Sequence, residues 1–402
     1  MKNLQQYYTE LDHECLSILD WWMKHSIDDN NGGFYGRIDN DNNVMSGAPK
    51  GAVLNFRILW TFSAAYNHYK TPAYLQTATR AFNYISTHFI DTDYGGVYWS
   101  VDEFGKPLDV KKQVYAIAFA VYGLSEYYMA SNDETALSSA IDLYNAIERY
   151  SHDIHRGGYL EAFSRDWNDL PDLRLSAKDF NEKKTMNTHL HVLEAYANLY
   201  KIWPDEELKK NIIALINLFI QYFIDSETGH LILFFDDEWN PRHGMISYGH
   251  DIEAAWLVQE AAEIINAADL IEKVKELSEK LAIAAARGLD GDGGLWYEKD
   301  IINNHMVKEK HWWPQAEAMV GFYNLWENTG NQSYLQKSLD SWSFTQQHLL
   351  NKQKGEWNWG VKADNSIMQG EDKAGLWKCP YHNGRACLEL MNRIKAKQQA
   401  AS

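Results

Sequence analysis

The sequence predicts an all-α protein built as an (α/α)6 barrel, with six inner helices, six outer helices and short β-hairpins at one end. Two observations lead to this prediction: a glycine-aromatic motif returns six times, and the helical segments on its two sides differ in how many faces are apolar. No linker or low-complexity tract interrupts the pattern. One domain is therefore expected over residues 1–402, with a polar tail at 395–402 that should fray.

The repeated motif is a glycine followed by a short aromatic or apolar run. Its glycines are 63, 62, 71, 65 and 61 residues apart, which is regular enough to indicate six copies of one unit. Each copy has an acidic or Gly/Asn-rich segment before it, such as DDNNG at 28–32, and this is a turn and hairpin signal. The six glycines are Gly33, Gly96, Gly158, Gly229, Gly294 and Gly355.

The helical segments between the hairpins are of two kinds. Those before a hairpin are amphipathic, clearly at 270–286 and more weakly at 207–223. Those after a hairpin, at 52–66, 114–122 and 252–258, are apolar nearly all round. A helix with one wet face lies outside and a helix with none lies inside, so six inner helices should begin at the same end of the barrel.

Composition limits the possible partners. Of the 402 residues, 45% are hydrophobic, so a large core is available, and the formal charge of -17 argues against a nucleic acid or an anionic membrane as partner. Sixteen tryptophans and 24 tyrosines suit a carbohydrate-binding cleft, although they also suit a large core. A small-molecule substrate and a monomeric state are expected.

Cysteine usage and the amino-terminal residues bear on the compartment. Cys15, Cys379 and Cys387 cannot all pair and show no CxxC spacing, which favours a reduced compartment. No apolar signal segment and no run of membrane-spanning length is present, so a cytoplasmic protein is expected. The chain also lacks GxGxxG and Walker patterns, and no cofactor is expected.

The first two inner helices offer an arginine and a set of aromatic residues. Arg57 lies within an apolar run, where its charge needs either a ligand or a buried partner; a salt-bridged core arginine is the alternative. Tyr115, Phe119 and Tyr122 recur at helical spacing on the second inner helix, where core packing would be the usual explanation.

The third inner helix contains KKTMNTHLHVLE at 183–194. Asn187 and His191 share a face and Glu194 follows three residues later, whereas His189 must point elsewhere. Two histidines two positions apart on a helix diverge by roughly 200°, which is poor spacing for metal ligands. No metal site is therefore expected.

The fourth inner helix begins in YGHDIEAAW at 248–256. His250 and Glu253 are one turn apart, so the carboxylate can accept from one ring nitrogen and orient the other toward a substrate. The positive end of the helix disfavours imidazolium, so His250 should be neutral and able to accept a proton. The alternative is a histidine that caps a structural helix.

The fifth inner helix begins in HWWPQAE at 311–317. Pro314 suits a first helical turn, and Trp313 with Glu317 could form a stacking platform and a hydroxyl acceptor for a sugar, or the tryptophan could belong to the core. In the sixth segment, WKCPYHNGR at 377–385, proline again precedes a histidine, His382.

The predicted barrel brings these polar residues to one rim. We expect His250 and His382 roughly across the barrel from each other, with His191 between them. Three histidines, one arginine and two carboxylates on a single rim are hard to explain as packing, because buried polar groups cost free energy unless they are satisfied.

Five segments carry a resemblance to a known family. NFRILW, MNTHLHVLEAY, YGHDIEAAW, WWPQAEA and CPYHNGR resemble the N-acylglucosamine 2-epimerase superfamily, most closely its cellobiose 2-epimerase branch. The likeness spans nearly the whole chain, and the five motifs together are highly specific. The fold that the resemblance implies is the (α/α)6 barrel, in agreement with the repeat count.

The resemblance also implies roles for particular residues. His250 and His382 would be the general acid/base pair, Arg57 would bind O1 and O2 and stabilise an enediolate, His191 would assist near these oxygens, and Glu253 would orient a histidine. The implied sugar site is lined by Tyr115, Phe119, Asp179, Asn187, Trp313, Glu317 and Trp377. Asp179 and Phe119 match by position more than by a distinctive motif.

The implied reaction is metal-independent inversion of C2 in the reducing-end glucose of a β-1,4-linked disaccharide such as cellobiose or lactose, with aldose-ketose isomerisation as a side activity. Within the same superfamily, an N-acylglucosamine 2-epimerase or a mannose isomerase is the nearest alternative. An (α/α)6 glycoside hydrolase that uses Glu253 and Glu317 as paired carboxylates, or a noncatalytic binding barrel, is the alternative from another class.

Overall fold

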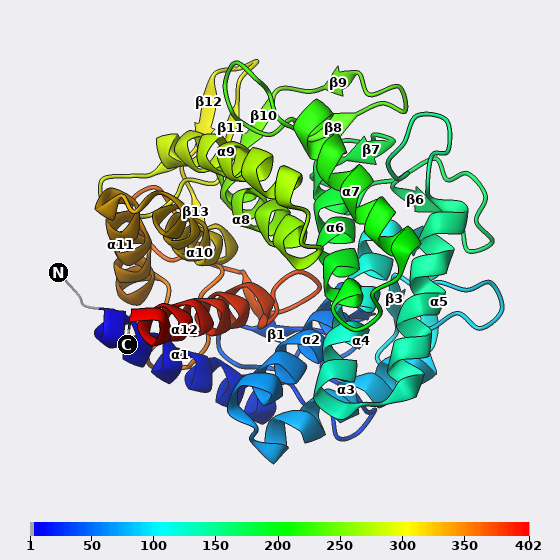
Figure 1. Ribbon diagram of the computed structural model, residues 1–402. Coiled ribbons are helices and arrows are strands. Elements are labelled where there is room, and N and C mark those ends of the chain that lie inside the picture. Colours follow the sequence, from blue (N-terminus) through cyan, green and yellow to red (C-terminus); the bar gives the residue numbers. More distant parts are fainter. Residues whose placement is uncertain (1–3, 402) are drawn as a thin grey trace.

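The computed structural model describes residues 4–401, which form two concentric layers of helices (Figure 1). Each inner helix packs against the next, and the last one packs against the first, so the ring is closed. The inner helices are α2 (Ala52–Tyr69), α4 (Val114–Ser131), α6 (Met186–Tyr200), α8 (Tyr248–Ile264), α10 (Trp312–Thr329) and α12 (Tyr381–Ala401). This arrangement confirms the predicted (α/α)6 barrel.

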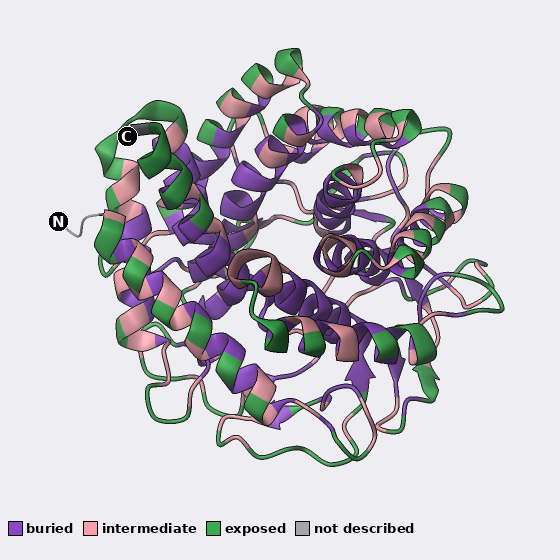
Figure 2. Ribbon diagram, turned by 60° about the horizontal axis from the view of Figure 1, so that its bottom comes forward, coloured by how far each residue is buried: buried purple, intermediate pink, exposed green. Residues whose placement is uncertain are grey.

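The outer layer alternates with the inner one along the chain. It consists of α1 (Leu4–His25), α3 (Pro72–His88), α5 (Glu134–Tyr150), α7 (Glu206–Leu218), α9 (Ala268–Ala285) and α11 (Gln332–His348). A π-helical turn, Phe219–Phe223, continues α7, and a short 3-10 turn, Ala286–Gly288, follows α9. Figure 2 shows exposed residues along one side of the outer helices, whereas the inner helices are buried nearly all round, as predicted from their composition.

The six glycine motifs close tight turns. An antiparallel bridge spans each motif: Ile27 with Phe34, Ile90 with Val97, His152 with Tyr159, Ile224 with Leu231, Leu289 with Leu295, and Leu350 with Trp357. Glycine is needed at such a turn because the backbone is left-handed at five of the six motif glycines, and at Gly293 rather than Gly294 in the fifth repeat. At Gly158 the φ angle is +77° and an added Cβ would lie 2.6 Å from the ring of Trp239.

Short antiparallel strands join neighbouring repeats at the end of the barrel where the inner helices begin. The pairings are β2-β3-β4, β5-β6, β7-β8-β9, β10-β11-β12, β13-β14 and β1-β15, and the last of these joins the final repeat to the first. The strands are β1 (Ile38–Asp39), β2 (Lys50–Gly51), β3 (Ser100–Val101), β4 (Pro107–Asp109), β5 (Lys112–Gln113), β6 (Ala162–Phe163), β7 (Lys184–Thr185), β8 (Phe234–Phe235), β9 (Pro241–Arg242), β10 (Met245–Ser247), β11 (Glu298–Asp300), β12 (His305–Val307), β13 (Lys310–His311), β14 (Gly360–Val361) and β15 (Asp372–Ala374).

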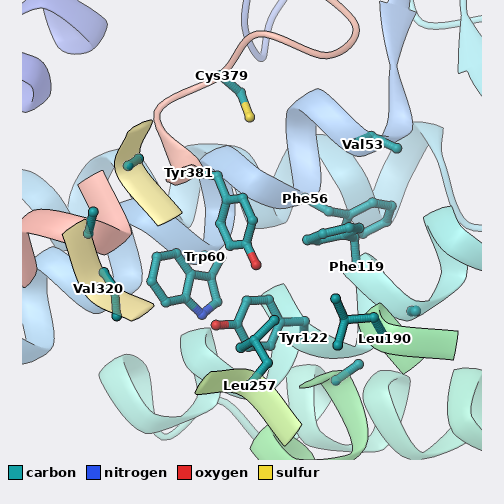
Figure 3. Packing of buried hydrophobic residues seen from close by; sticks show 14 of the residues in the cluster. Val53, Phe56, Trp60, Phe119, Tyr122, Leu190, Leu257, Val320, Cys379 and Tyr381 are labelled. Atoms are coloured by element: carbon teal, nitrogen blue, oxygen red, sulfur yellow. The ribbon is translucent and has the colours of Figure 1, made fainter. Parts of the chain in front are cut away.

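Aromatic side chains fill the interior of the ring. Trp60 stacks on Tyr122 with ring centroids 5.2 Å apart, and Phe119 meets Tyr381 edge-on at 5.3 Å (Figure 3). This layer closes the middle of the barrel, so a site at the hairpin end has a solid floor.

The carboxyl-terminal tail differs from the prediction. Over 395–401 the chain is helical rather than frayed, and Ser402, the last residue of the predicted tail, lies outside the described residues. Lys397 explains part of this order, because its Nζ lies 4.3 Å from the ring centroid of Trp326. Within residues 4–401, none of the helices combines the length and the apolar character that spanning a membrane requires.

A buried lysine on the strand before the inner helix pairs with an aspartate of the turn in four repeats and was not predicted from the sequence. In the first repeat, Lys50 Nζ lies 2.8 Å from Asp28 Oδ2, and the two side chains are only 1% and 2% exposed. Equivalent buried lysines bind the aspartate that begins the turn in three further repeats, at Lys112, Lys184 and Lys310. In these repeats the ion pair connects the turn to the strand that precedes the inner helix.

Replacing Lys50 with methionine should lower the free energy of unfolding by about 3–5 kcal/mol, because Asp28 would be left buried without its cation. Urea denaturation followed by circular dichroism would measure the loss. Lys210→Met is the control, since the Lys210–Glu207 pair is 67% exposed on both sides and should change stability by less than about 0.5 kcal/mol. Equal stability of the two variants would contradict the structural role of Lys50.

Candidate active site

A cavity of about 500 Å³ opens at the end of the barrel where the inner helices begin. Most of the predicted site residues line it: Arg57, Tyr115, Asp179, Asn187, His191, His250, Glu253, Trp313, Trp377 and His382. Phe119 and Glu317 instead lie behind the residues that face the cavity and contact them. The structure thus brings the predicted residues together at one place.

His382 is held by a carboxylate. Its Nδ1 donates to Glu317 Oε1 at 2.7 Å, which leaves Nε2 as the lone-pair nitrogen. Burial, helped by the positive charges of Arg57 and Arg385, holds the pKa of His382 well below its usual range. The imidazole is therefore a neutral base at neutral pH.

Glu317 has a different position from the one predicted. Its oxygens accept hydrogen bonds from His382, from Trp256 Nε1 at 3.0 Å and from Arg385 at 2.7 Å. We expected Glu317 to accept a sugar hydroxyl, but it does not line the cavity. Its contacts make it a positioning residue for His382.

His250 is also anchored through Nδ1, but not by the residue we predicted. Nδ1 shares a hydrogen bond of 2.8 Å with Ser247 Oγ, in the residue that immediately precedes α8. The expected bond between His250 and Glu253 is thus replaced by a bond to Ser247. Burial, followed by the proximity of His191, lowers the pKa of His250 to about 3, so the imidazole is neutral, as predicted, although burial is the main cause.

The two histidines lie on either side of Trp313. The ring centroid of Trp313 is 4.7 Å from that of His250 and 5.7 Å from that of His382. Because α10 lies between α8 and α12 in the ring, the prediction that His250 and His382 face each other across the barrel with His191 between them is wrong. The indole provides one wall that both imidazoles share.

Arg57 has no carboxylate partner within ion-pair distance among the described residues. Its Nη2 donates to the hydroxyl of Tyr115 at 2.7 Å, its guanidinium lies 4.1 Å from the ring centroid of Phe119, and its Nε has no hydrogen-bond partner. A salt-bridged core arginine is therefore not what the structure shows. A buried guanidinium of this kind is suited to binding an anion that forms during a reaction.

His191 belongs to a network that extends below the cavity. Its Nδ1 lies 2.8 Å from Glu194 Oε2, and Glu194 Oε1 accepts from the Tyr381 hydroxyl at 2.6 Å and from Arg385. Burial alone would raise the pKa of Glu194, but Arg385 and His191 lower it to about 2. Glu194 is thus an ionised carboxylate that orients His191.

Glu253 lies nearer to His382 than its sequence position suggested. Its Oε1 is 3.9 Å from His382 Nδ1 and accepts from Arg385 Nη2 at 2.9 Å. Burial, together with the neighbouring Glu317 carboxylate, raises the pKa of Glu253.

Glu253, Glu317 and His382 form a potential metal-binding group, because their donor atoms lie within 4.8 Å of one another. The guanidinium of Arg385 donates to both carboxylates, however, and occupies the place that a cation would take. The donor set therefore fits an arginine better than a metal ion, and metal independence stays a prediction.

The other predicted residues line the remaining walls. Asp179 accepts from the backbone N and Oγ of Ser176, both at 2.8 Å, and so shapes a turn beside the cavity. Asn187 Oδ1 is buried and has no hydrogen-bond partner. The half-buried ring of Trp377 lines the cavity and lies 6.0 Å from that of Tyr115.

Several residues of the site were not predicted. Ser247 binds His250, and Arg385 binds Glu317. The cavity is also lined by Phe180, Tyr297, Glu298, Trp312 and Trp359. Arg385 could have been found, because it follows His382 by three residues and therefore lies on the same helix face. The residues on hairpins and loops carry no such periodic signal.

The chain matches a known protein family over most of its length. The family model of N-acylglucosamine 2-epimerase (GlcNAc 2-epimerase) matches residues 33–386. The chain belongs to this family. The protein is accordingly an isomerase, a carbohydrate epimerase that acts on a small sugar.

Relatives with high coverage carry a more specific name. A cellobiose 2-epimerase from Bacteroides fragilis is 50% identical over 93% of this chain and 95% of its own length, and one from Dictyoglomus turgidum is 38% identical over 95% and 97%. The solved structure of cellobiose 2-epimerase from Bacillus thermoamylovorans B4167 is 40% identical and superposes with a TM-score of 0.93 over 97% of this chain and 100% of that chain.

Proposed function

We propose that this family member is a cellobiose 2-epimerase that inverts C2 of the reducing-end glucose in β-1,4-linked disaccharides, with cellobiose and lactose as substrates. The names of the relatives above support the substrate class. The observation that carries the chemistry is the pair His250 and His382, each anchored at Nδ1 and both packed on Trp313.

In the proposed mechanism the sugar ring opens, one neutral imidazole removes the proton from C2, and a cis-enediolate forms. A positioned general base typically contributes about 10² to 10⁴ in rate. The guanidinium of Arg57, which has no carboxylate partner among the described residues and whose Nε makes no hydrogen bond with them, stabilises the charge on O1 and O2, and His191 assists near these oxygens.

Inversion then requires a proton on the opposite face of C2. The second imidazole supplies it after taking up a proton from solvent, with rotation about C2–C3 where the geometry demands it. The first imidazole releases the proton that it removed to solvent, so both are neutral again when the next turnover begins. Delivery of the proton to C1 instead would give the ketose, which explains the expected isomerase side activity.

The decisive experiment incubates the pure enzyme with cellobiose in D2O and follows the anomeric proton signals by NMR. Deuterium at C2, a new mannose signal and an intact glycosidic bond are expected. Free mannose and N-acetylglucosamine are tested in parallel. Reaction of a monosaccharide alone would refute the substrate assignment and favour a mannose isomerase or an N-acylglucosamine 2-epimerase.

The hydrolase alternative fits the geometry poorly. Glu253 and Glu317 both accept from Nη2 of Arg385, at 2.9 and 2.7 Å, and Glu317 does not reach the cavity. Two carboxylates that meet at one nitrogen cannot flank a glycosidic bond from opposite sides, as hydrolysis requires. Release of free glucose from cellobiose would contradict this argument.

Replacing Trp377 with alanine should raise KM for cellobiose about 3- to 10-fold and change kcat little, because loss of one aromatic contact removes about 0.5–1.5 kcal/mol. Steady-state kinetics on cellobiose and on a monosaccharide would measure the change in preference. Trp167→Ala is the control, since Trp167 stacks on Tyr150 outside the cavity. An unchanged substrate profile for Trp377→Ala would remove this residue from the proposed sugar site.

The cytoplasmic location, the monomeric state and the absence of a cofactor remain predictions from the sequence. Size-exclusion chromatography with light scattering would test the monomeric state. Activity after exhaustive treatment with a chelator would test whether a metal ion is needed.

A further inference from the structure

We propose that Arg385 is a positioning residue shared by two histidines, which it fixes through separate carboxylates: His382 through Glu317 and His191 through Glu194. The inference rests on the proposed function, because it assigns these histidines to the reaction. The family resemblance described above implies no role for Arg385.

The contacts of Arg385 carry the proposal. Nη2 donates to Glu317 Oε1 at 2.7 Å, the same oxygen that accepts from His382, and also to Glu253 at 2.9 Å. Nη1 donates to Glu194 Oε1, which leaves Oε2 of that carboxylate for His191. One guanidinium therefore determines the orientation of the carboxylates behind both imidazoles.

The charge and shape of the side chain explain why arginine is required. The three carboxylates come from α6, α8 and α10, and they would repel one another without a cation among them. A planar fork of donors can serve three acceptors at once, whereas an ammonium is a point charge. Arg385 is itself held between the rings of Tyr381 and Trp256, at 4.2 and 4.8 Å from their centroids.

Arg385 acts from behind the site. It does not line the active-site cavity, but it lines a second cavity of about 250 Å³ together with polar residues such as Glu126, Asn198 and Glu260. A small cation in solution would therefore have a route to the place of the guanidinium that does not pass through the sugar site.

Arg393 provides a matched control on the same helix. It lies two turns further along α12, is largely buried, and binds Glu389 at 2.6 Å and Glu327 at 2.9 Å. It touches no residue of the active site. A comparison of substitutions at 385 and 393 thus separates positioning of the histidines from the loss of a buried ion pair.

The first arm of the test measures turnover and rescue. Arg385→Ala should lower kcat for C2 exchange of cellobiose about 100-fold with little change in KM, the loss expected when a general base is misplaced. Millimolar guanidinium chloride should restore part of the activity. Arg393→Ala should keep wild-type kcat and show no rescue.

The second arm uses the pH profile. The charged and titratable groups that face His382 are Arg57 from α2, His191 and Glu194 from α6, Glu253 from α8, Glu317 from α10, and Arg385 on its own helix. Burial is the main cause of the low pKa of His382, and Arg57 and Arg385 lower it further.

Loss of one of these positive charges should raise the pKa of His382, so more of the imidazole becomes protonated and inactive as the pH falls. The acid limb of kcat/KM should therefore move to higher pH in Arg385→Ala. Arg385→Lys keeps the charge but not the fork, and it should lower kcat without moving the limb. Simple structural damage would lower activity at every pH and leave the limb in place.

A substrate-free readout separates this inference from the proposed function. The Nδ1–H resonances of His191 and His382 in ¹H–¹⁵N spectra should shift in Arg385→Lys and stay unchanged in Arg393→Lys. If they do so while cellobiose proves not to be a substrate, the positioning role stands and the substrate proposal fails. If Arg385→Lys matches Arg393→Lys in these resonances, in kcat and in pH profile, the inference is wrong.

Discussion

Alanine at either His250 or His382 should lower kcat for C2 epimerisation by about 10² to 10⁴, the range typical for loss of a general acid or base. Folding should survive both changes. His250 is half-buried and held by one hydrogen bond to Ser247, and removal of His382 leaves Glu317 still paired with Arg385 and Trp256. The measurement is the rate of product formation from cellobiose, with urea denaturation as the check on stability.

Deuterium exchange at C2 tests the roles of His250 and His382 separately. If each imidazole serves one face of C2, each single variant should still exchange the C2 hydrogen of one epimer in D2O and fail to exchange that of the other. The two variants should show opposite preferences. The exposed residue His305 on β12 supplies the control, and His305→Ala should exchange both epimers at the wild-type rate. A double variant that still interconverts the epimers would exclude the two-histidine mechanism.

The sequence was sufficient to predict the fold because the repeat has two independent signals. The turns require glycines in the left-handed region, and the inner helices expose no polar face to solvent. The glycine motifs and the buried helices therefore indicate the same number of repeats. The starts of the inner helices were predicted well. Their ends were not, since the apolar run at 114–122 continues as helix to Ser131.

The sequence predicted which residues belong to the candidate site, but it did not predict their hydrogen-bond partners. Periodicity tells which face of a helix a residue occupies, but not which neighbouring side chain reaches it first. His250 and Glu253 share a face, yet Ser247 takes Nδ1 of the imidazole and Arg385 takes the carboxylate. For the same reason Glu317 was placed in the sugar site, although its oxygens are occupied behind His382.

Buried cations were the largest omission. Lys50 and its counterparts precede inner helices in short strands that the sequence pattern does not reveal, and their aspartate partners lie 20 to 31 residues away in the turns. A single sequence shows no sign of such pairing. Arg57 was recognised because an arginine inside a long apolar run is unusual, whereas Arg385 stands among polar residues at the start of α12.

Replacing Arg57 with lysine should lower kcat about 10² to 10³, as expected when a donor to a developing oxyanion is lost. Arg57 Nε has no partner in the protein, and Nη2 is held toward Tyr115, so the fork is ordered without being neutralised by a carboxylate. A lysine ammonium could keep the charge but could not contact O1 and O2 together. Arg57→Met should be slower still.

The division of the effect between kcat and KM tests this role. Stabilisation of an enediolate acts only in the transition state, so kcat and kcat/KM should fall by the same factor while KM changes little. Arg242→Lys, at an arginine that is half exposed and paired with Asp236, is the matched control and should behave as wild type. If Arg57→Lys instead raises KM and preserves kcat, Arg57 binds the sugar equally in its ground state, and another group must carry the charge of the intermediate.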